Sequence, residues 1–423
     1  MASPNRPRES WQVSKPTIAV IGDWHNAWVT AACLASLGHD VTLVSESERL
    51  SVYEPGLDEM IAKARDAQLF HRCSPDKLWS AKYGWIALDT PLDESDRPDT
   101  APVMAAALKA AERTRSLIVS SQVPLGFCQE VEKKTGLDVA YVPENMRLGD
   151  GIRTFLQPDR LIVGASAAGY ASIIAHHLLE GVHVEPLLTD LPTAEMAKHA
   201  TNAYLATQIS LANELASIGQ HYGVDTDIVA KALKLDPRIG PKAYVKPGMG
   251  FSGGTLPRDL RVLQRLALRA ELASFIIDET LAVNERVFKE VARQACNRLG
   301  AETILLLGYS YKADIDTLRR SPAISTAREI RALSSGKEII GFDPVMNDRD
   351  LSEIGNLITH RHVFPQAADV AVVLTPRAAF KGLNWKSLQG CKLVLDCCDG
   401  ADASAVLSAG IPYKKLWGKV QQP

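Results

Sequence analysis

The sequence of 423 residues has no apolar run as long as a membrane-crossing helix, which needs about 20 residues. Residues 1–15 are polar and charged and lack the apolar centre of a secretion signal, so we expect a disordered tail and a cytoplasmic location. The formal net charge is only −2, which offers no electrostatic attraction to nucleic acid or to an anionic membrane. The sequence therefore predicts a globular protein with neither nucleic acid nor membrane as a partner.

Cysteine pairs at metal-binding or redox spacing are also missing. None of the seven cysteines belongs to a C-x-x-C pair, and no histidine cluster accompanies them. The sequence therefore predicts neither a zinc site nor a disulfide framework. We expect the cysteines to be small buried hydrophobic residues.

What the sequence does contain is an alternation of apolar strands and helices on either side of a helical region. Residues 16–190 show this alternation, which is typical of a parallel, doubly wound, Rossmann-like sheet. Residues 301–423 repeat it with four further apolar segments, starting at "TILLLGYSYK". The strands predicted in the first region are residues 17–21, 41–44, 84–88, 116–120, 138–141 and 160–164.

The region between the two sheets, residues 191–300, has helical periodicity and few strand signals. One long helix is predicted from residue 194 to 222, because neither proline nor glycine interrupts it before Gly219. The expected fold is α/β, with two Rossmann-like doubly wound domains joined by a central helical domain.

The turn after the first strand has an unexpected composition. The stretch "VIGDWHNAWV" has the strand–glycine–helix outline of a nucleotide-binding unit, whose G-x-G-x-x-G motif lays bare backbone against a pyrophosphate. Trp24 stands where the second glycine is needed, and we expect it to pack into the core at a vacated site. The alternative is that it caps another ligand. We expect His25 to be a solvent-facing turn residue.

Five stretches resemble the UDP-glucose/GDP-mannose dehydrogenase family, in the order in which the family has them. They are "YEPGLDEMI", "PENMRLGDGIRTFLQPDRLIVGA", "EMAKHATNAYLATQISLANELA", "LDPRIGPKAYVKPGMGFSGGTLPRD" and "GYSYKADIDTLRRSP". Members oxidise a nucleotide-bound hexose twice with NAD, and a cysteine thiolate traps the intermediate aldehyde. The resemblance implies a nucleotide sugar as the ligand, a role in polysaccharide biosynthesis, and a dimer formed through the central helical domain.

The resemblance places NAD on the first turn, but the residues there depart from the family pattern. An indole at the second glycine position fills the volume of the pyrophosphate, and Asp23 adds negative charge beside it. A serine replaces the acid that holds the ribose, and an aspartate replaces a turn glycine. We therefore expect no cofactor, with NAD bound only under the alternative below. The family's cofactor positions fall on Gly22, Trp24, Ala27, Ser45 and Asp89.

The catalytic positions are also altered. The nucleophilic cysteine falls on Thr255, and a catalytic threonine falls on Gln122. A threonine hydroxyl is far less acidic than a thiol, so it is a poor substitute. Lys198 and Asn202 are four residues apart and share a helix face. The resemblance implies that the retained catalytic positions are Glu144, Lys198, Asn202 and Asp259.

The positions that hold the nucleotide sugar are nearly intact. The resemblance implies that they wrap uridine and diphosphate and reach the sugar, and lysine and arginine bond phosphate oxygens with charge assistance. The motifs favour a UDP-hexose as the ligand. The positions are Arg238, Lys242, Tyr244, Gly250, Lys312 and Arg319.

Three functions follow from this pattern. The chain is a UDP-hexose-binding protein that has lost the NAD-dependent two-step oxidation, either as a pseudoenzyme or as an enzyme with redox-free sugar-nucleotide chemistry. Alternatively, it is an NAD-dependent UDP-sugar 6-dehydrogenase with an atypical cofactor site, which oxidises the C6 alcohol. In the third case it is a structural partner of an active paralogue. NAD affinity separates the first two, and co-purification with an active relative would indicate the third.

Overall fold

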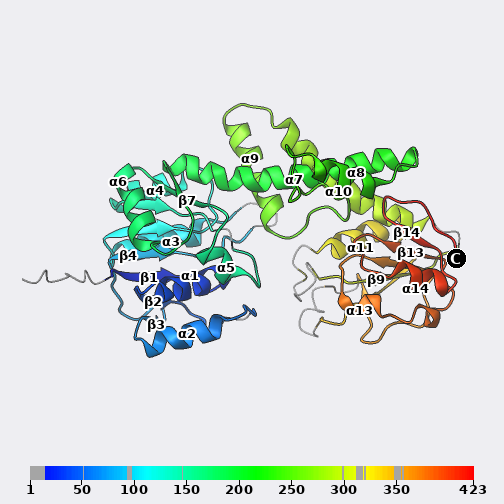
Figure 1. Ribbon diagram of the computed structural model, residues 1–423, viewed down its shortest axis with the longest axis horizontal. Coiled ribbons are helices and arrows are strands. Elements are labelled where there is room, and N and C mark those ends of the chain that lie inside the picture. The colour runs from blue at the N-terminus through cyan, green and yellow to red at the C-terminus, as the bar shows by residue number, and fades with distance from the viewer. Residues whose placement is uncertain are drawn as a thin grey trace, which may run out of the picture. The chain divides into compact units, whose positions relative to one another are not determined.

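The computed structural model describes residues 15–50, 52–92, 98–144, 146–297, 300–310, 318, 321–346, 354 and 357–423. The chain forms two compact units, Met1–Lys198 and His199–Pro423. Each unit is built on one sheet; Figure 1 draws the first sheet in blue to green and the second in yellow to red. The α/β prediction with two Rossmann-like sheets is confirmed.

The first unit contains an eight-stranded sheet with the order β3-β2-β1-β4-β5-β6-β7-β8. Its first six strands follow the order of the doubly wound nucleotide-binding fold, and only β6 and β7 pair antiparallel. All six predicted strands are present, whereas β3 and β8 were not predicted. The strands are β1 Thr17–Ile21, β2 Asp40–Val44, β3 Phe70–Cys73, β4 Tyr83–Ile86, β5 Ser116–Val119, β6 Val139–Tyr141, β7 Leu161–Ala165 and β8 Pro186–Thr189.

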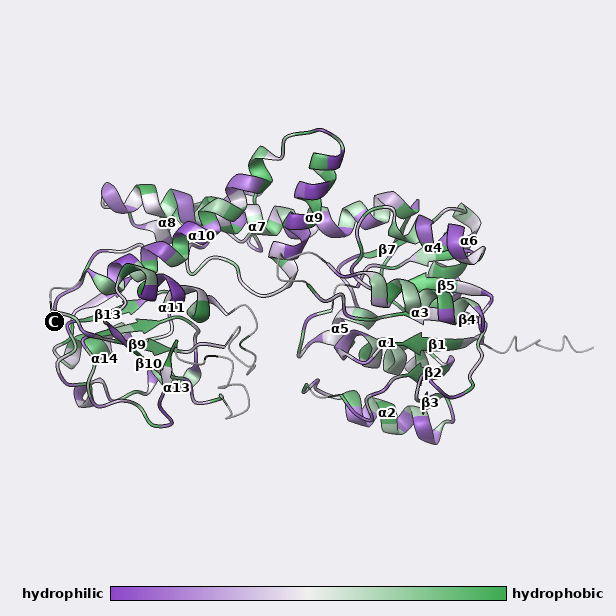
Figure 2. Cartoon of the chain, turned by 180° about the vertical axis from the view of Figure 1, so that it is seen from behind, coloured by the Kyte–Doolittle hydropathy of each residue, from purple (hydrophilic) through white to green (hydrophobic). Residues whose placement is uncertain are grey.

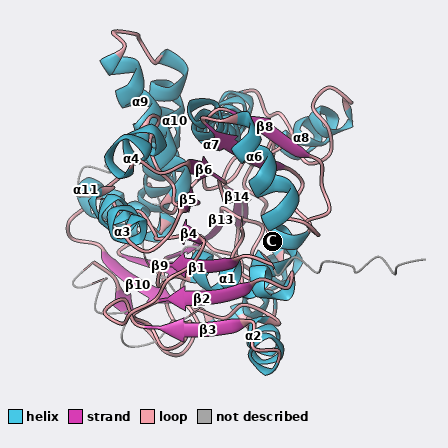
Figure 3. Ribbon diagram, turned by 90° about the vertical axis from the view of Figure 1, so that its left-hand side faces the viewer, coloured by secondary structure: helices cyan, strands magenta, loops and turns pink. Residues whose placement is uncertain are grey.

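Helices cover both faces of this sheet, with α1 and α2 on one side and α3 and α4 on the other (Figure 3). The central strands are therefore apolar along their whole length; Val20 and Ile118, for example, are fully buried. The helices are α1 His25–Ser36, α2 Leu57–Asp66, α3 Ala101–Ala111, α4 Phe127–Thr135, α5 Gly151–Leu156 and α6 Ala168–Ile173, followed by one π-helical turn, Ile174–Leu178.

The second unit contains a six-stranded, all-parallel sheet with the order β11-β10-β9-β12-β13-β14, the same winding as the first. Figure 2 shows the central strands of both sheets in the hydrophobic colour, as burial on both faces requires. The strands are β9 Thr303–Leu307, β10 Glu338–Phe342, β11 Thr359–His360, β12 Val370–Val373, β13 Leu393–Asp396 and β14 Tyr413–Lys415.

The predicted long helix is present as α7, Leu191–His221, which begins in the first unit and continues into the second. Within the second unit α10 packs against α11, so a single apolar core includes Val287 and Val291 of α10 and Ala327 of α11. The remaining helices are α8 Thr226–Leu235, α9 Thr255–Arg269, α10 Phe275–Cys296, α11 Pro322–Leu333, α13 Ala378–Lys381 and α14 Ala403–Ser408, with a 3-10 turn at Trp385–Ser387. Domain boundaries at residues 190 and 300 stay a prediction.

Within the described ranges, no helix is both long and apolar enough to cross a bilayer. Nor do these ranges hold a group of three or more His, Cys, Asp or Glu side chains placed to bind a metal ion. All seven cysteines lie in the described part of the chain, and each is a free thiol.

Candidate functional site

The turn between β1 and α1 depends on a glycine at its first position. Gly22 has a φ of +156°, and a Cβ atom there would lie 2.5 Å from the Ala87 carbonyl oxygen and 2.8 Å from the Ala27 Cβ. Ala27 is itself fully buried, as a helix–strand packing position should be. The sequence therefore keeps the residues that shape this turn.

The carboxylate of Asp23 lies at the end of β2 and binds the groups there. One oxygen, Oδ1, accepts hydrogen bonds from Ser45 Oγ at 2.8 Å and from the backbone N–H of Glu46 at 2.6 Å, and the N–H of Ser47 lies 3.3 Å away. Ser45 is fully buried. The donors at the position predicted to hold the ribose are thus already bound to a charged group of the chain itself. From the sequence we expected only that Asp23 adds negative charge.

The prediction that Trp24 packs into the core is wrong. Trp24 is the N-cap residue of α1 and its side chain is 40 % exposed, because it lies in the surface turn after β1, where Asp23 is exposed as well. The indole thus stands at the surface. Asp89 is exposed as well, and its carboxylate accepts the backbone N–H of Thr90 at 3.0 Å.

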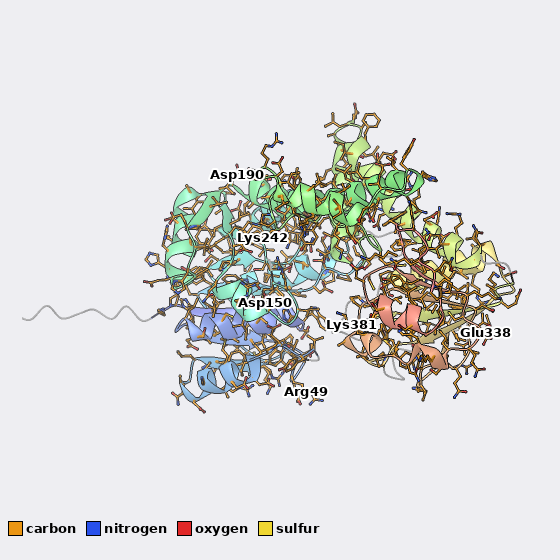
Figure 4. All side chains as sticks on the ribbon, turned by 45° about the vertical axis from the view of Figure 1, so that its right-hand side comes forward. Arg49, Asp150, Asp190, Lys242, Glu338 and Lys381 are labelled. Carbon is orange, nitrogen blue, oxygen red and sulfur yellow. The ribbon has the colours of Figure 1, made fainter. Side chains whose placement is uncertain are left out.

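The prediction that His25 faces solvent is also wrong. His25 is 5 % exposed, and its Nε2 lies 2.6 Å from Oε2 of Glu54. The Glu54 carboxylate also accepts the backbone N–H groups of Gly149 at 2.9 Å and Gly151 at 2.7 Å. A buried carboxylate requires such partners. The pair therefore ties the start of α1 to the loop before α2 and to the start of α5, whose N-cap Asp150 is labelled in Figure 4.

The first unit brings together two of the retained positions that were predicted to be catalytic. Lys198 on α7 is 6 % exposed, and its Nζ donates to the backbone oxygen of Glu144 and lies 3.6 Å from Glu144 Oε1. Glu144 Oε2 accepts the N–H of Met146 at 2.9 Å. Gln122, which follows β5, is also buried. The sequence did not indicate that Lys198 and Glu144 pair directly.

The second unit brings the other two retained positions together around a fully buried carboxylate. Asn202 Nδ2 donates to Oδ2 of Asp259, and His199 Nδ1 lies 3.2 Å from Oδ1. Arg258 Nε lies 3.9 Å from the same oxygen. Thr255 is the first residue of α9, one turn before Asp259, and it is exposed. His199 was missed, although its spacing of three from Asn202 places both on one face of α7.

All seven cysteines lie in the described part of the chain, and burial raises the pKa of each thiol above its ordinary value. A catalytic thiolate needs the opposite shift, which a nearby cation or a helix N-terminus provides. The structure thus contains the expected buried thiols, with Cys33, Cys128 and Cys397 buried and the other four partly so.

The predicted nucleotide-sugar residues of the central segment are mostly exposed. Arg238 is bidentate with Asp236, at 3.0 and 2.7 Å, and Lys242, labelled in Figure 4, is exposed. Tyr244 is about half exposed, and its backbone N–H donates to Gln208 Oε1 at 3.1 Å.

Gly250 has a φ of +79°, and a Cβ there would lie 2.4 Å from Asn284 Oδ1, so only glycine fits. Lys312 and Arg319 lie outside the described residues.

A cavity of about 820 Å³ lies wholly within the second unit, at the carboxyl ends of β12, β13 and β14. Residues 246–250, part of the predicted substrate loop, form another wall. Ligands of open parallel sheets bind at this edge, and the volume is that of a nucleotide-sized site. Three lysines line it, Lys246, Lys415 and Lys419, and none of them was singled out from the sequence.

Comparison with known proteins agrees with this architecture. Three domain models of the UDP-glucose/GDP-mannose dehydrogenase family match in order: the NAD binding domain over residues 16–178, the central domain over residues 192–286 and the UDP binding domain over residues 305–415. A UDP-glucose 6-dehydrogenase of Bacillus subtilis is 27 % identical over 96 % of this chain and 98 % of its own.

Solved structures of similar proteins match over nearly the whole chain. A UDP-glucose dehydrogenase from Pyrobaculum islandicum has a TM-score of 0.84 and 26 % identity, covering 98 % of this chain and 100 % of its own. A UDP-D-ManNAc dehydrogenase from Pyrococcus horikoshii has a TM-score of 0.81 and 25 % identity, covering 95 % and 99 %.

Proposed function

Since the chain belongs to the UDP-glucose/GDP-mannose dehydrogenase family, we propose that it binds a UDP-linked hexose in the cavity of its second unit. The observation that carries this proposal is the cavity of about 820 Å³ between residues 246–250 and the carboxyl ends of β12 to β14. The part of its wall that follows β12 and β13 and includes Lys415 lies in the region that matches the family's UDP binding domain, residues 305–415. Lysines there can bond phosphate oxygens with charge assistance.

We further propose that the NAD-dependent double oxidation has been lost. The residues at the first turn do not fit NAD: the Asp23 carboxylate takes the donors at the end of β2, and Trp24 replaces a residue that must leave the backbone bare for a pyrophosphate. A dianionic pyrophosphate would also meet the negative charge of Asp23. These contacts and charges support the proposal that NAD does not bind at this turn.

We propose that the nucleophile that would trap the aldehyde intermediate covalently has been lost as well. Thr255 occupies the cysteine position, and burial raises the pKa of all seven thiols. A hydroxyl with an ordinary pKa needs an adjacent base to act as a nucleophile. Within the second unit, the charged cluster around Asp259 leaves redox-free acid–base chemistry on a bound sugar as the remaining enzymatic option.

One observation favours the alternative, NAD-dependent oxidation at C6. Relatives that match this chain over most of its length are named UDP-glucose 6-dehydrogenase. Under this reading the turn opens when NAD binds, and Asp23 releases the end of β2. NADH formation that depends on a UDP-hexose would establish this alternative directly.

For assembly we propose a homodimer through the central helices, with pairing to an active paralogue as the alternative. Exposed apolar side chains on α7 and α10 support this, since surface patches of this kind mark contact sites. Family membership also supports a role in polysaccharide biosynthesis, with the cytoplasm as the expected location.

Calorimetric titration with UDP, UDP-glucose and NAD in parallel tests the proposal. We expect both uridine nucleotides to bind and to raise the melting temperature, because a ligand that binds only the native state stabilises it. We expect no NAD binding below about 1 mM, the upper end of the usual range for enzyme substrates. A melting curve unmoved by millimolar UDP-glucose would contradict nucleotide-sugar binding, and micromolar NAD affinity would contradict the loss of the cofactor.

A further inference from the structure

In the cavity of the second unit, the carboxylate of Asp399 lies between two lysines. Lys415 Nζ is 2.9 Å from Asp399 Oδ1, and Lys246 Nζ contacts Asp399 Oδ2. Lys415 also lies 2.6 Å from Asp227 Oδ2. Lys246 comes from the loop after α8, Lys415 ends β14, and Asp399 follows β13, so the ion pairs join separate segments across the cavity wall.

The loop that carries Asp399 is fixed by its own hydrogen bonds. Asp399 has a φ of +55°, the left-handed region that few residues other than glycine adopt. The carboxylate of Asp396 holds this turn, since it accepts the backbone N–H groups of Cys398 at 3.1 Å, Gly400 at 3.0 Å and Ala401 at 2.9 Å. The position of Asp399 between the lysines is therefore set by the turn.

Asp399 carries its negative charge at neutral pH. Burial acts to raise the pKa of its carboxyl group, but the hydrogen bonds from Lys246 and Lys415 together hold the pKa below its ordinary value. The side chains of Lys246, Asp399 and Lys415 are 56 %, 36 % and 41 % exposed. Partly exposed pairs are individually weak, so an anionic ligand can exchange with them.

We propose that Asp399 is a built-in competitor for the phosphates of the nucleotide: its carboxylate occupies the two lysine ammonium groups that phosphate oxygens would otherwise bond. The inference rests on the proposed nucleotide-sugar site and names the residue that limits its affinity. Without a phosphate, the lysines stay paired within the wall. A diphosphate must displace the carboxylate and then lies close to it, which weakens binding because like charges repel.

The decisive variant is Asp399→Asn, which removes the charge and keeps the shape. Asparagine adopts the left-handed backbone as readily as aspartate, so the turn remains folded. The matched control is Glu338→Gln in β10, an exposed carboxylate of the same unit outside the cavity wall, labelled in Figure 4. The probes are UDP and the uncharged nucleoside uridine, titrated by calorimetry against the full chain.

We expect Asp399→Asn to bind UDP about tenfold more tightly than the wild type and to bind uridine equally well, because only the phosphates meet the lysines. Glu338→Gln should leave both affinities unchanged. The inference is overturned if Asp399→Asn leaves UDP affinity unchanged, if uridine gains as much as UDP, or if Glu338→Gln gives the same gain. If neither the wild type nor Asp399→Asn binds UDP, the proposed nucleotide site falls as well, whereas equal UDP binding by both removes only the role of Asp399.

Discussion

At the scale of single residues, Glu54 is the side chain on which the first turn depends. Its buried carboxylate is hydrogen-bonded to His25 Nε2 and accepts two backbone N–H groups, at distances of 2.6 to 2.9 Å. Glu54→Gln puts a donor where an acceptor is needed. We therefore expect it to lower the free energy of unfolding by about 3 kcal/mol, because buried hydrogen-bonding groups lose their charged acceptor.

Denaturant unfolding followed by circular dichroism measures this loss. Asp66→Asn, at the exposed end of α2, is the control and should stay within about 0.5 kcal/mol of the wild type. If Glu54→Gln unfolds at the same denaturant concentration as Asp66→Asn, the pair does not stabilise the turn.

Restoring a cysteine at position 255 separates the proposed loss of the nucleophile from the proposed loss of NAD binding. Thr255→Cys supplies a thiol at the exposed start of α9, where the helix dipole favours the thiolate. Asp23 and Trp24 remain, so no hydride acceptor is bound. We expect no NADH absorbance with UDP-glucose or with other UDP-hexoses. Turnover by this single variant would show that the cofactor site works, and the dehydrogenase alternative would take first place.

The altered site could be located from the sequence, but its contacts could not. The resemblance singled out Trp24, Ser45 and Thr255 as departures, because each falls on a position with a fixed chemical task. The partners of His25 and Asp23 come from 29 and 22 residues further along the chain, and no local pattern indicates such pairings. This is why His25 was expected in solvent, although it is buried against Glu54.

At the scale of elements, α7 is attached to the first unit through α4. Glu195 of α7 is fully buried, and its carboxylate accepts the N–H groups of Gly126 at 2.6 Å and Cys128 at 2.9 Å at the start of α4. A carboxylate at a helix N-terminus satisfies free donors and complements the helix dipole. Glu195→Ala should therefore cost about 3 kcal/mol, because two buried N–H groups lose their acceptor.

The matched control is Glu130→Gln, an exposed residue of α4 that pairs with Lys134 at 2.8 Å, a type of contact worth about 0.5 kcal/mol or less. Hydrogen exchange adds a local measurement. The amides of Gly126 and Cys128 should lose protection in Glu195→Ala and keep it in Glu130→Gln. Unchanged protection in Glu195→Ala would mean that α4 does not need this cap.

At this scale, the strands that could be predicted from the sequence are those buried on both faces. Strands β1, β5 and β12 are apolar except for Thr17 and Ser116 at the starts of β1 and β5, because both faces are covered, and all three were predicted. Strand β3 reads "FHRC" and was missed, since an edge strand has little burial and its alternation is too short to stand out. The 31-residue α7 was predicted because nothing interrupts its pattern.

At the scale of the whole molecule, two sheets with the same winding differ in what lies at their carboxyl edges. In the first unit, Asp23 and Ser45 at this edge are hydrogen-bonded to each other. In the second unit, the edge keeps a cavity of about 820 Å³ lined by lysines. The shared fold therefore does not decide the function, and the side chains at each edge do.

Self-association is the last property of the whole molecule that the structure makes testable. Leu211 on α7 and Phe275 and Ile276 on α10 are exposed by 53 %, 76 % and 72 %, and they line a shallow apolar groove. We expect a homodimer through this surface, and Leu211→Glu with Phe275→Glu should yield monomers, because the pair would bury unpaired charges at the contact. Light scattering after size-exclusion chromatography gives the mass directly.

Leu333→Glu, on the exposed side of α11, is the control and should remain dimeric. Since the substituted side chains are exposed, the melting curve of the double variant should still be cooperative. A wild-type monomer, or a dimeric double variant, would place self-association elsewhere or rule it out.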